Sequence, residues 1–232
     1  MNLALNLWRT GGILAITMNS LDFPTVAKML PGIVAGLTCH EFMHGFVALR
    51  CGDPTARDEG RLSLNPLRHI DWLGFLFIVV AGFGWAKPVR INREYLHHPR
   101  RDEILISLAG PFANLVLGLV VSVLLRLMLW IRPFDGDPVY NVFLDVMILG
   151  AYVNYGLFVF NLLPLPPLDG SHVFFQSLRL SDATMATLYR YGIFILFGIL
   201  IIESQANITL LPVGAAVRWI ANSVFTLLGF SM

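Results

Sequence analysis

The sequence predicts an all-α polytopic membrane protein with about six transmembrane helices and a short membrane-dipping segment near residues 75–90. The first observation is composition: 56% of the 232 residues are hydrophobic and 13% are charged, whereas soluble domains carry about 25% charged residues. The second is that the apolar residues gather in runs long enough to cross a bilayer. The third is that most basic residues lie in one connection between two such runs. We therefore expect residues 1–232 to form a single membrane-embedded domain.

The apolar runs give the expected helices in chain order. Residues 3–19 are short for a span and are interrupted by Arg9 and a glycine pair. They form either a first transmembrane helix, the interpretation we favour, or a helix that lies at the membrane interface. The second helix lies within residues 24–50 and ends at Gly52-Asp53-Pro54, because proline and glycine stop helices. Four further spans are expected within residues 103–131, 141–163, 186–206 and 212–230.

The run from Phe75 to Val89 differs from these helices. It is apolar and rich in β-branched and aromatic residues, but it is short and broken by two glycines. These properties favour a β-hairpin or a re-entrant segment that dips into the membrane against protein.

Basic residues indicate which side of the membrane each connection faces. Nine of them lie between the second and third spans, whereas the 132–140 connection holds only Arg132. Positively charged connections stay in the cytoplasm. We therefore expect residues 50–102 and both termini on the cytoplasmic side of the cell's inner membrane.

The second helix contains the motif His40-Glu41-Phe42-Met43-His44. Residues four apart share a helix face, so His40 and His44 can present two imidazoles to one ion. Glu41 is offset by about 100°, outside the ligand set but within reach of water at the ion. This is the pattern of a zinc hydrolase with a glutamate base. A chance match is disfavoured, because ionisable residues inside the membrane are costly and mark functional sites.

A catalytic zinc ion needs a third protein ligand beside an open position. Asp169 is the best candidate, because it follows the proline-rich stretch Pro164–Pro167, whose backbone cannot be helical and must line a cavity if it lies in the membrane. Taken alone, Asp169-Gly170 would be read as a solvated turn. We expect His40, His44 and Asp169 to bind one catalytic Zn²⁺, with Glu41 as the catalytic base.

Two motifs of this chain resemble the signatures of the site-2 protease family, the intramembrane zinc metalloproteases. They are the His40–His44 motif and the stretch from Asn161 to Gly170, which reads N-x-x-P-x-P-P-L-D-G. Residues 109–114 resemble the family's third helix, and residues 60–71 and 84–89 resemble its compact prokaryotic branch, which lacks PDZ and CBS domains. The resemblance covers about residues 30–175, the expected catalytic core.

The resemblance implies the same zinc ligands and a membrane-anchored protein substrate, such as an anti-sigma factor or a membrane-bound transcription factor. It does not imply how the substrate is selected. The lipid bilayer is the other expected partner, and no nucleic acid is expected.

Further site residues are predicted with alternatives. The Asn161 amide is expected to stabilise the oxyanion, and bonding between helices is the alternative. Trp85 and Lys87 are expected to contact an extended substrate that pairs with the stretch from Phe83 to Val89. The alternative is that residues 75–89 only pack as a hairpin under the catalytic helices. Asn114 is a candidate substrate contact, although helix packing is the interpretation we favour for it.

Two other functions fit parts of the pattern. A non-proteolytic membrane metal-binding or transport protein would need several ligands along a path and no glutamate base. A zinc hydrolase of the prenyl-protein type would use a glutamate as its third ligand, and no glutamate here has that context. Intramembrane proteolysis is therefore the favoured prediction.

Overall fold

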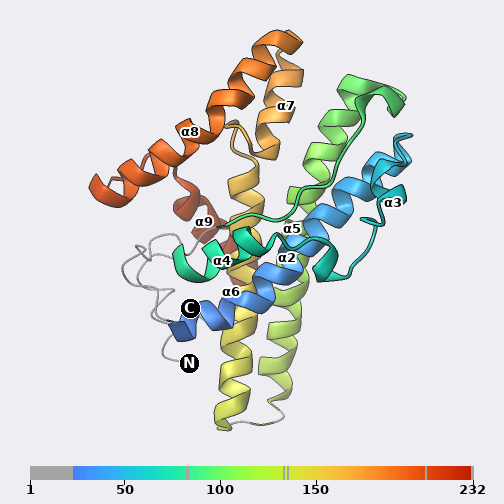
Figure 1. The fold of residues 1–232 in the computed structure, drawn as a ribbon. Helices are drawn as coiled ribbons and strands as arrows, with labels where there is room; N and C mark the ends of the chain where they lie inside the picture. Colours follow the sequence, from blue (N-terminus) through green and yellow to red (C-terminus); the bar gives the residue numbers. More distant parts are fainter. Residues whose placement is uncertain (1–22, 82–83, 133, 135, 207, 231–232) are drawn as a thin grey trace.

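The computed structural model describes residues 23–81, 84–132, 134, 136–206 and 208–230, so the expected span at 3–19 lies outside the described residues. Within them the chain is helical and contains no β-strand, apart from one isolated bridge. The helices are α2 Phe23–Arg50, α3 Thr55–Asp58, α4 Trp72–Ala81, α5 Pro99–Ile131, α6 Pro138–Asn161, α7 Asp169–Ser177, α8 Asp182–Ala206 and α9 Val213–Leu227, with 3-10 turns η3 Pro66–Arg68 and η4 Arg93–Tyr95 (Figure 1).

Four described helices are long and apolar enough to cross a membrane: α2, α5, α6 and α8. They begin and end within a few residues of the predicted runs. α2 ends at Arg50, two residues before Gly52, whose φ of +108° suits glycine. α9 differs from its prediction as a span, because its 15 residues extend only about 22 Å at 1.5 Å per residue. The predicted number of about six spans is therefore not confirmed.

α2, α5 and α6 pack together as the centre of the molecule (Figure 1). α5 and α6 run antiparallel, and the Asp137 side chain caps α6 by accepting hydrogen bonds from the Val139 and Tyr140 amides. α2 crosses them closely at a pair of glycines: a Cβ on Gly32 would lie 2.5 Å from the Gly150 Cα. The close crossing brings polar side chains of all three helices into contact.

α9 closes the apolar core on the other side of α6. Its Val213, Val217, Ala221 and Phe225 pack against Leu125 and the tyrosines of α6 in one buried cluster. These positions recur every four residues, as expected of a helix with one apolar face. α9 thus packs against α5 and α6 and buries their apolar side chains.

The described residues near 75–90 include the helix α4 and do not confirm a β-hairpin, which was one of the two expectations beside a re-entrant segment. Asp71 accepts hydrogen bonds from the Leu73 and Gly74 amides and so caps a helix, Trp72–Ala81, where the first strand was expected. The chain then reverses, and Ala86 forms the isolated antiparallel bridge with Ile70. A helix satisfies its own backbone groups in apolar surroundings, which a lone hairpin arm does not.

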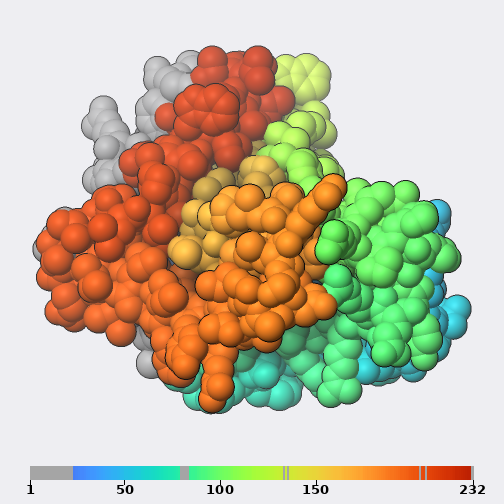
Figure 2. All heavy atoms as spheres, turned by 90° about the horizontal axis from the view of Figure 1, so that it is seen from above, coloured from blue at the N-terminus to red at the C-terminus, as the bar shows by residue number. Residues whose placement is uncertain are grey.

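Hydrogen bonds and ion pairs fix the connection from α2 to α5 at several points. Asp53 is fully buried, and its carboxylate accepts from the Thr55 and Asn92 amides. Arg93 of η4 forms ion pairs with Glu103 of α5 and Asp182 of α8. Figure 2 shows α7 and the start of α8, in orange, covering the end of α6 beside the green start of α5.

Candidate active site

Three side chains meet where α2, α5 and α7 come together. His40 Nε2 lies 3.0 Å from His44 Nε2, and Asp169 Oδ2 lies 3.0 Å and 3.3 Å from these two nitrogens. Both histidines are buried, at 6% and 7% exposure. This is the one group of three or more metal-ligating side chains found among the described residues.

The helices place these groups in different ways. His40 and His44 are one turn apart on α2 and share the face that meets α5. Asp169 was expected in a non-helical segment, but it is the first residue of α7. The residues before it form turns, and Leu168 is extended, at φ −74° and ψ 153°. The proline-rich stretch therefore ends two residues before Asp169. The first turn of α7 sets the orientation of the Asp169 side chain.

Hydrogen bonds to Nδ1 orient both imidazoles. His40 Nδ1 lies 2.7 Å from the Asn114 side-chain oxygen, and His44 Nδ1 lies 2.7 Å from the Ile106 carbonyl. Both oxygens are acceptors, so each Nδ1 carries the proton in the neutral ring. Each Nε2 then presents a lone pair, which is the form that binds a metal.

The arrangement fits a zinc ion. Ligand atoms at 2.0–2.1 Å around a tetrahedral ion lie about 3.3 Å apart, close to the three distances observed. Asp169 Oδ2 is buried without a hydrogen-bond partner, as expected of an atom that awaits a cation. Two imidazole nitrogens and a carboxylate oxygen are a donor set that zinc accepts.

Gly110 of α5 provides the space for the ion. A Cβ at this position would lie 2.5 Å from His44 Nε2 and 2.7 Å from His40 Nε2. Only glycine lets α5 pack against the open side of both rings. The sequence marked Gly110 only as part of a family-like stretch.

Glu41 faces the connection between α4 and α5. Its Oε2 accepts a 2.8 Å hydrogen bond from the Val89 backbone amide, and the residue is 9% exposed. The same segment is anchored by buried Arg61, whose guanidinium donates to the carbonyls of Lys87 and Pro88. The non-helical stretch 84–90 therefore lies against the predicted base through Val89.

The other predicted site residues differ in what they contact and in how exposed they are. Asn161 ends α6, and its amide donates to the Leu157 carbonyl of its own helix. The Trp85 ring packs on Phe77 of α4, 5.4 Å between centroids, and Lys87 is exposed. Asn114 is fully buried behind His40, which supports the packing interpretation and places it out of reach of a substrate.

Several known proteins are similar to this chain. The model of Peptidase family M50 matches residues 28–202. The chain is 38% identical over 189 residues, covering 81% of it and 82% of the relative, to a Bacillus subtilis protein named "Putative zinc metalloprotease YwhC". It is 33% identical over 177 residues to the Mycobacterium tuberculosis protein named "Putative zinc metalloprotease Rip2", covering 72% of this chain and 65% of the relative. No solved structure matches it significantly. The chain therefore belongs to peptidase family M50, the site-2 protease family.

Proposed function

We propose that the protein is an intramembrane zinc endopeptidase that cuts membrane-anchored proteins within or beside their transmembrane segment. The observation that carries the proposal is the set of three ligand atoms from His40, His44 and Asp169 with Glu41 beside them. The family and the names of its relatives support the same reaction. The four apolar helices support its place in a membrane.

The residues divide the chemistry between them. When bound, a zinc ion supplies Lewis acidity that activates water and polarises a carbonyl. Glu41 accepts the proton of the attacking water on its carboxylate and returns it to the leaving amine. Asn114 and Ile106 hold the imidazoles in the ligating tautomer. Asn161 stays a candidate for the oxyanion, because its side-chain NH₂ group has two N–H donors and the Leu157 carbonyl accepts from only one of them.

The substrate is proposed to bind as an extended strand along residues 84–90. A helical peptide bond is shielded by its own hydrogen bonds and side chains, so the substrate must unwind before it is cut. Stretch 84–90 is not helical, forms an isolated β-bridge at Ala86, contacts Glu41 through Val89 and carries Trp85 and Lys87. An unwound segment can pair with such an edge by strand addition.

Cross-linking tests this binding mode. In a Glu41→Gln, Cys39→Ala, Cys51→Ala background, a cysteine at Lys87 is expected to cross-link to a cysteine beside the scissile bond of a single-span substrate that the wild type cleaves. The matched control is a cysteine at Val139, which is 77% exposed at the other end of α5 and α6. Equal yields at both positions would exclude the strand-addition mode.

Asp169→Ala tests the metal site. The change removes the predicted anionic ligand, so we expect both zinc affinity and cleavage to fall. Loss of a group that only hydrogen-bonds to a metal ligand already weakens metal binding by about 10–100-fold. Loss of a ligand itself should therefore weaken it by at least about 10²-fold. Zinc content and affinity are measured on purified protein by chelator competition. Wild-type affinity in this variant would remove Asp169 from the ligand set.

A transport or metal-storage function is the second candidate. It predicts several ligand groups along a path through the membrane, whereas the residues described here hold one group. It also gives Glu41 no role. A variant that retains zinc but loses cleavage therefore separates the two functions.

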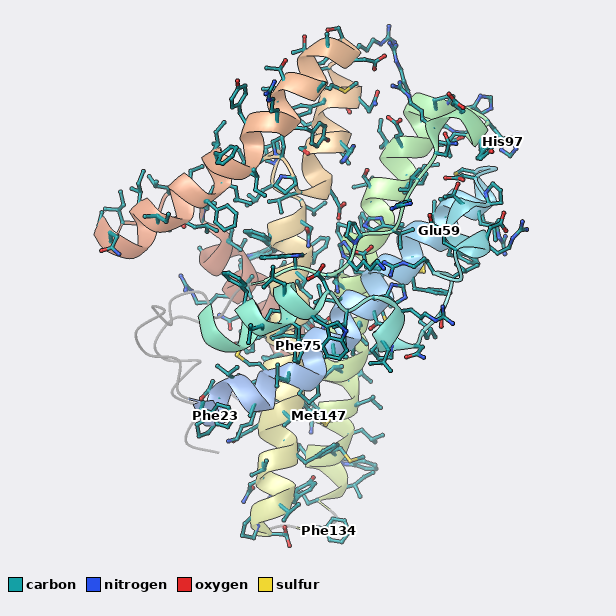
Figure 3. The ribbon with its side chains drawn as sticks, viewed as in Figure 1. Phe23, Glu59, Phe75, His97, Phe134 and Met147 are labelled. Atoms are coloured by element: carbon teal, nitrogen blue, oxygen red, sulfur yellow. The ribbon has the colours of Figure 1, made fainter. Side chains whose placement is uncertain are left out.

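The site is proposed to open toward the cytoplasm. Glu59 and His97 mark the end of the molecule that carries the basic connection, and Phe134 marks the opposite end (Figure 3). Basic connections stay inside. Native Cys51 is a poor reporter of topology because it is buried.

Engineered cysteines report the orientation instead. In a background without Cys39 and Cys51, a membrane-impermeant maleimide added to whole cells should label a cysteine at Val139. It should label one at exposed Arg57 only after permeabilisation. The reverse pattern would invert the proposed topology.

A further inference from the structure

Two buried asparagines form a chain of hydrogen bonds that reaches His40 from behind. Gly32, Gly36 and His40 lie four residues apart along α2 and so share one face. Asn114 of α5 and Asn154 of α6 pack against that face, at 0% and 1% exposure. A Cβ on Gly36 would lie 2.7 Å from the Asn154 Oδ1, so the glycines leave the room that the two amides occupy.

Every polar atom of the two amides has a partner. Asn114 Oδ1 accepts from His40 Nδ1, and Asn114 Nδ2 donates to the Gly36 carbonyl at 3.0 Å and to Asn154 Oδ1 at 3.1 Å. Asn154 Nδ2 donates to the carbonyls of Gly32 at 3.3 Å and Gly150 at 2.8 Å. The chain therefore runs from α6 through α5 to the imidazole.

The carbonyls give this chain a direction. A backbone carbonyl can only accept, so the two carbonyls beside Asn154 hold its NH₂ group and turn its oxygen toward Asn114. That oxygen and the Gly36 carbonyl hold the Asn114 NH₂ group and turn its oxygen toward His40. A reversed Asn114 would instead place an N–H against Nδ1, forcing the His40 proton onto Nε2, the atom that must bind the metal.

We infer that Asn154 is a positioning residue of the metal site: through Asn114 it holds His40 in the tautomer that presents Nε2 to zinc. This inference rests on the proposed function, because it assigns the ligating atom of His40. Replacing Asn154 with leucine leaves one Asn114 N–H buried without an acceptor, which is unfavourable enough to let the amide reorient. Loss of such an outer partner typically weakens metal binding by 10–100-fold.

Zinc affinity of the purified full-length protein, measured by chelator competition, tests the inference without relying on cleavage. Asn154→Leu is expected to weaken zinc binding about 10-fold or more. Asn154→Asp in its protonated form can donate its O–H to the Gly150 carbonyl and keep its other oxygen facing Asn114. This variant should therefore stay within about 3-fold of wild type, below the range for a lost partner. Ser122→Ala is the matched control, because it also removes a buried hydrogen bond between α5 and α6, to the Tyr155 hydroxyl, away from the site. It should leave zinc affinity unchanged.

A double variant separates positioning from general stability. Because Asn154 acts through Asn114, adding Asn154→Leu to Asn114→Ala should weaken zinc binding no further. Additive losses, a wild-type affinity in Asn154→Leu, or an Asp variant as weak as Asn114→Ala would each overturn the inference. If Asn154→Leu does not fold, Asn154→Ala takes its place, because it removes the same acceptor oxygen from the Asn114 NH₂ group. A wild-type protein that binds no zinc would overturn the proposed function as well, whereas the other outcomes overturn this inference alone.

Discussion

Glu41→Gln is expected to abolish peptide-bond hydrolysis while zinc stays bound. The change removes the group that accepts and returns the proton, and general acid–base catalysis contributes about 10²–10⁴-fold in rate. Glutamine keeps an oxygen that can accept the hydrogen bond of the Val89 amide. The local structure should therefore persist, so cleavage falls for a chemical reason.

The measurement pairs two readouts on the same purified sample. Turnover of a single-span substrate should fall by at least about 10²-fold, and zinc affinity should match wild type. Wild-type turnover by Glu41→Gln would remove Glu41 from the mechanism. Loss of zinc together with turnover would instead make Glu41 part of the metal site.

Gly110→Ala is expected to close the metal pocket. The added methyl group would lie 2.5 Å from His44 Nε2 and 2.7 Å from His40 Nε2, the atoms that face the ion. Neither ring can move away freely, because Asn114 and Ile106 hold both by Nδ1. We expect zinc affinity to fall on the order of 10²-fold, the largest effect usual for loss of a group that hydrogen-bonds to a metal ligand. Cleavage should fall with it.

Gly156→Ala is the matched control. An added Cβ there meets nothing within 4 Å among the described residues, and alanine favours a helix more than glycine does. Both variants should therefore be folded, and only Gly110→Ala should lose zinc. Normal zinc binding by Gly110→Ala would mean that α5 can retreat from the site.

The long helices could be predicted from the sequence because apolar runs and stop signals define them. α2, α5, α6 and α8 follow runs of apolar residues, and Gly52-Asp53-Pro54 ends the first of them. α4 was missed, because its β-branched and aromatic composition favours strands. Asp71, directly before the apolar run, was the available signal of a helix start.

Part of the site could also be predicted from local sequence patterns. The spacing of His40 and His44 fixes a shared helix face, and the proline-rich stretch drew attention to Asp169. The Ile106 carbonyl and the Val89 amide are backbone groups, which every residue type offers, so no sequence pattern announces them. Gly110 could be noticed but not interpreted, since its role depends on how closely α5 approaches α2.

Because Asp169 lies at the start of α7, the three ligand atoms come from both ends of the catalytic core. A chain in which α2 is in place but α7 has not yet packed against α5 therefore presents His40 and His44 without Asp169. Such a chain lacks the third ligand that the proposed zinc site needs, so we expect the site to form only when α7 has packed.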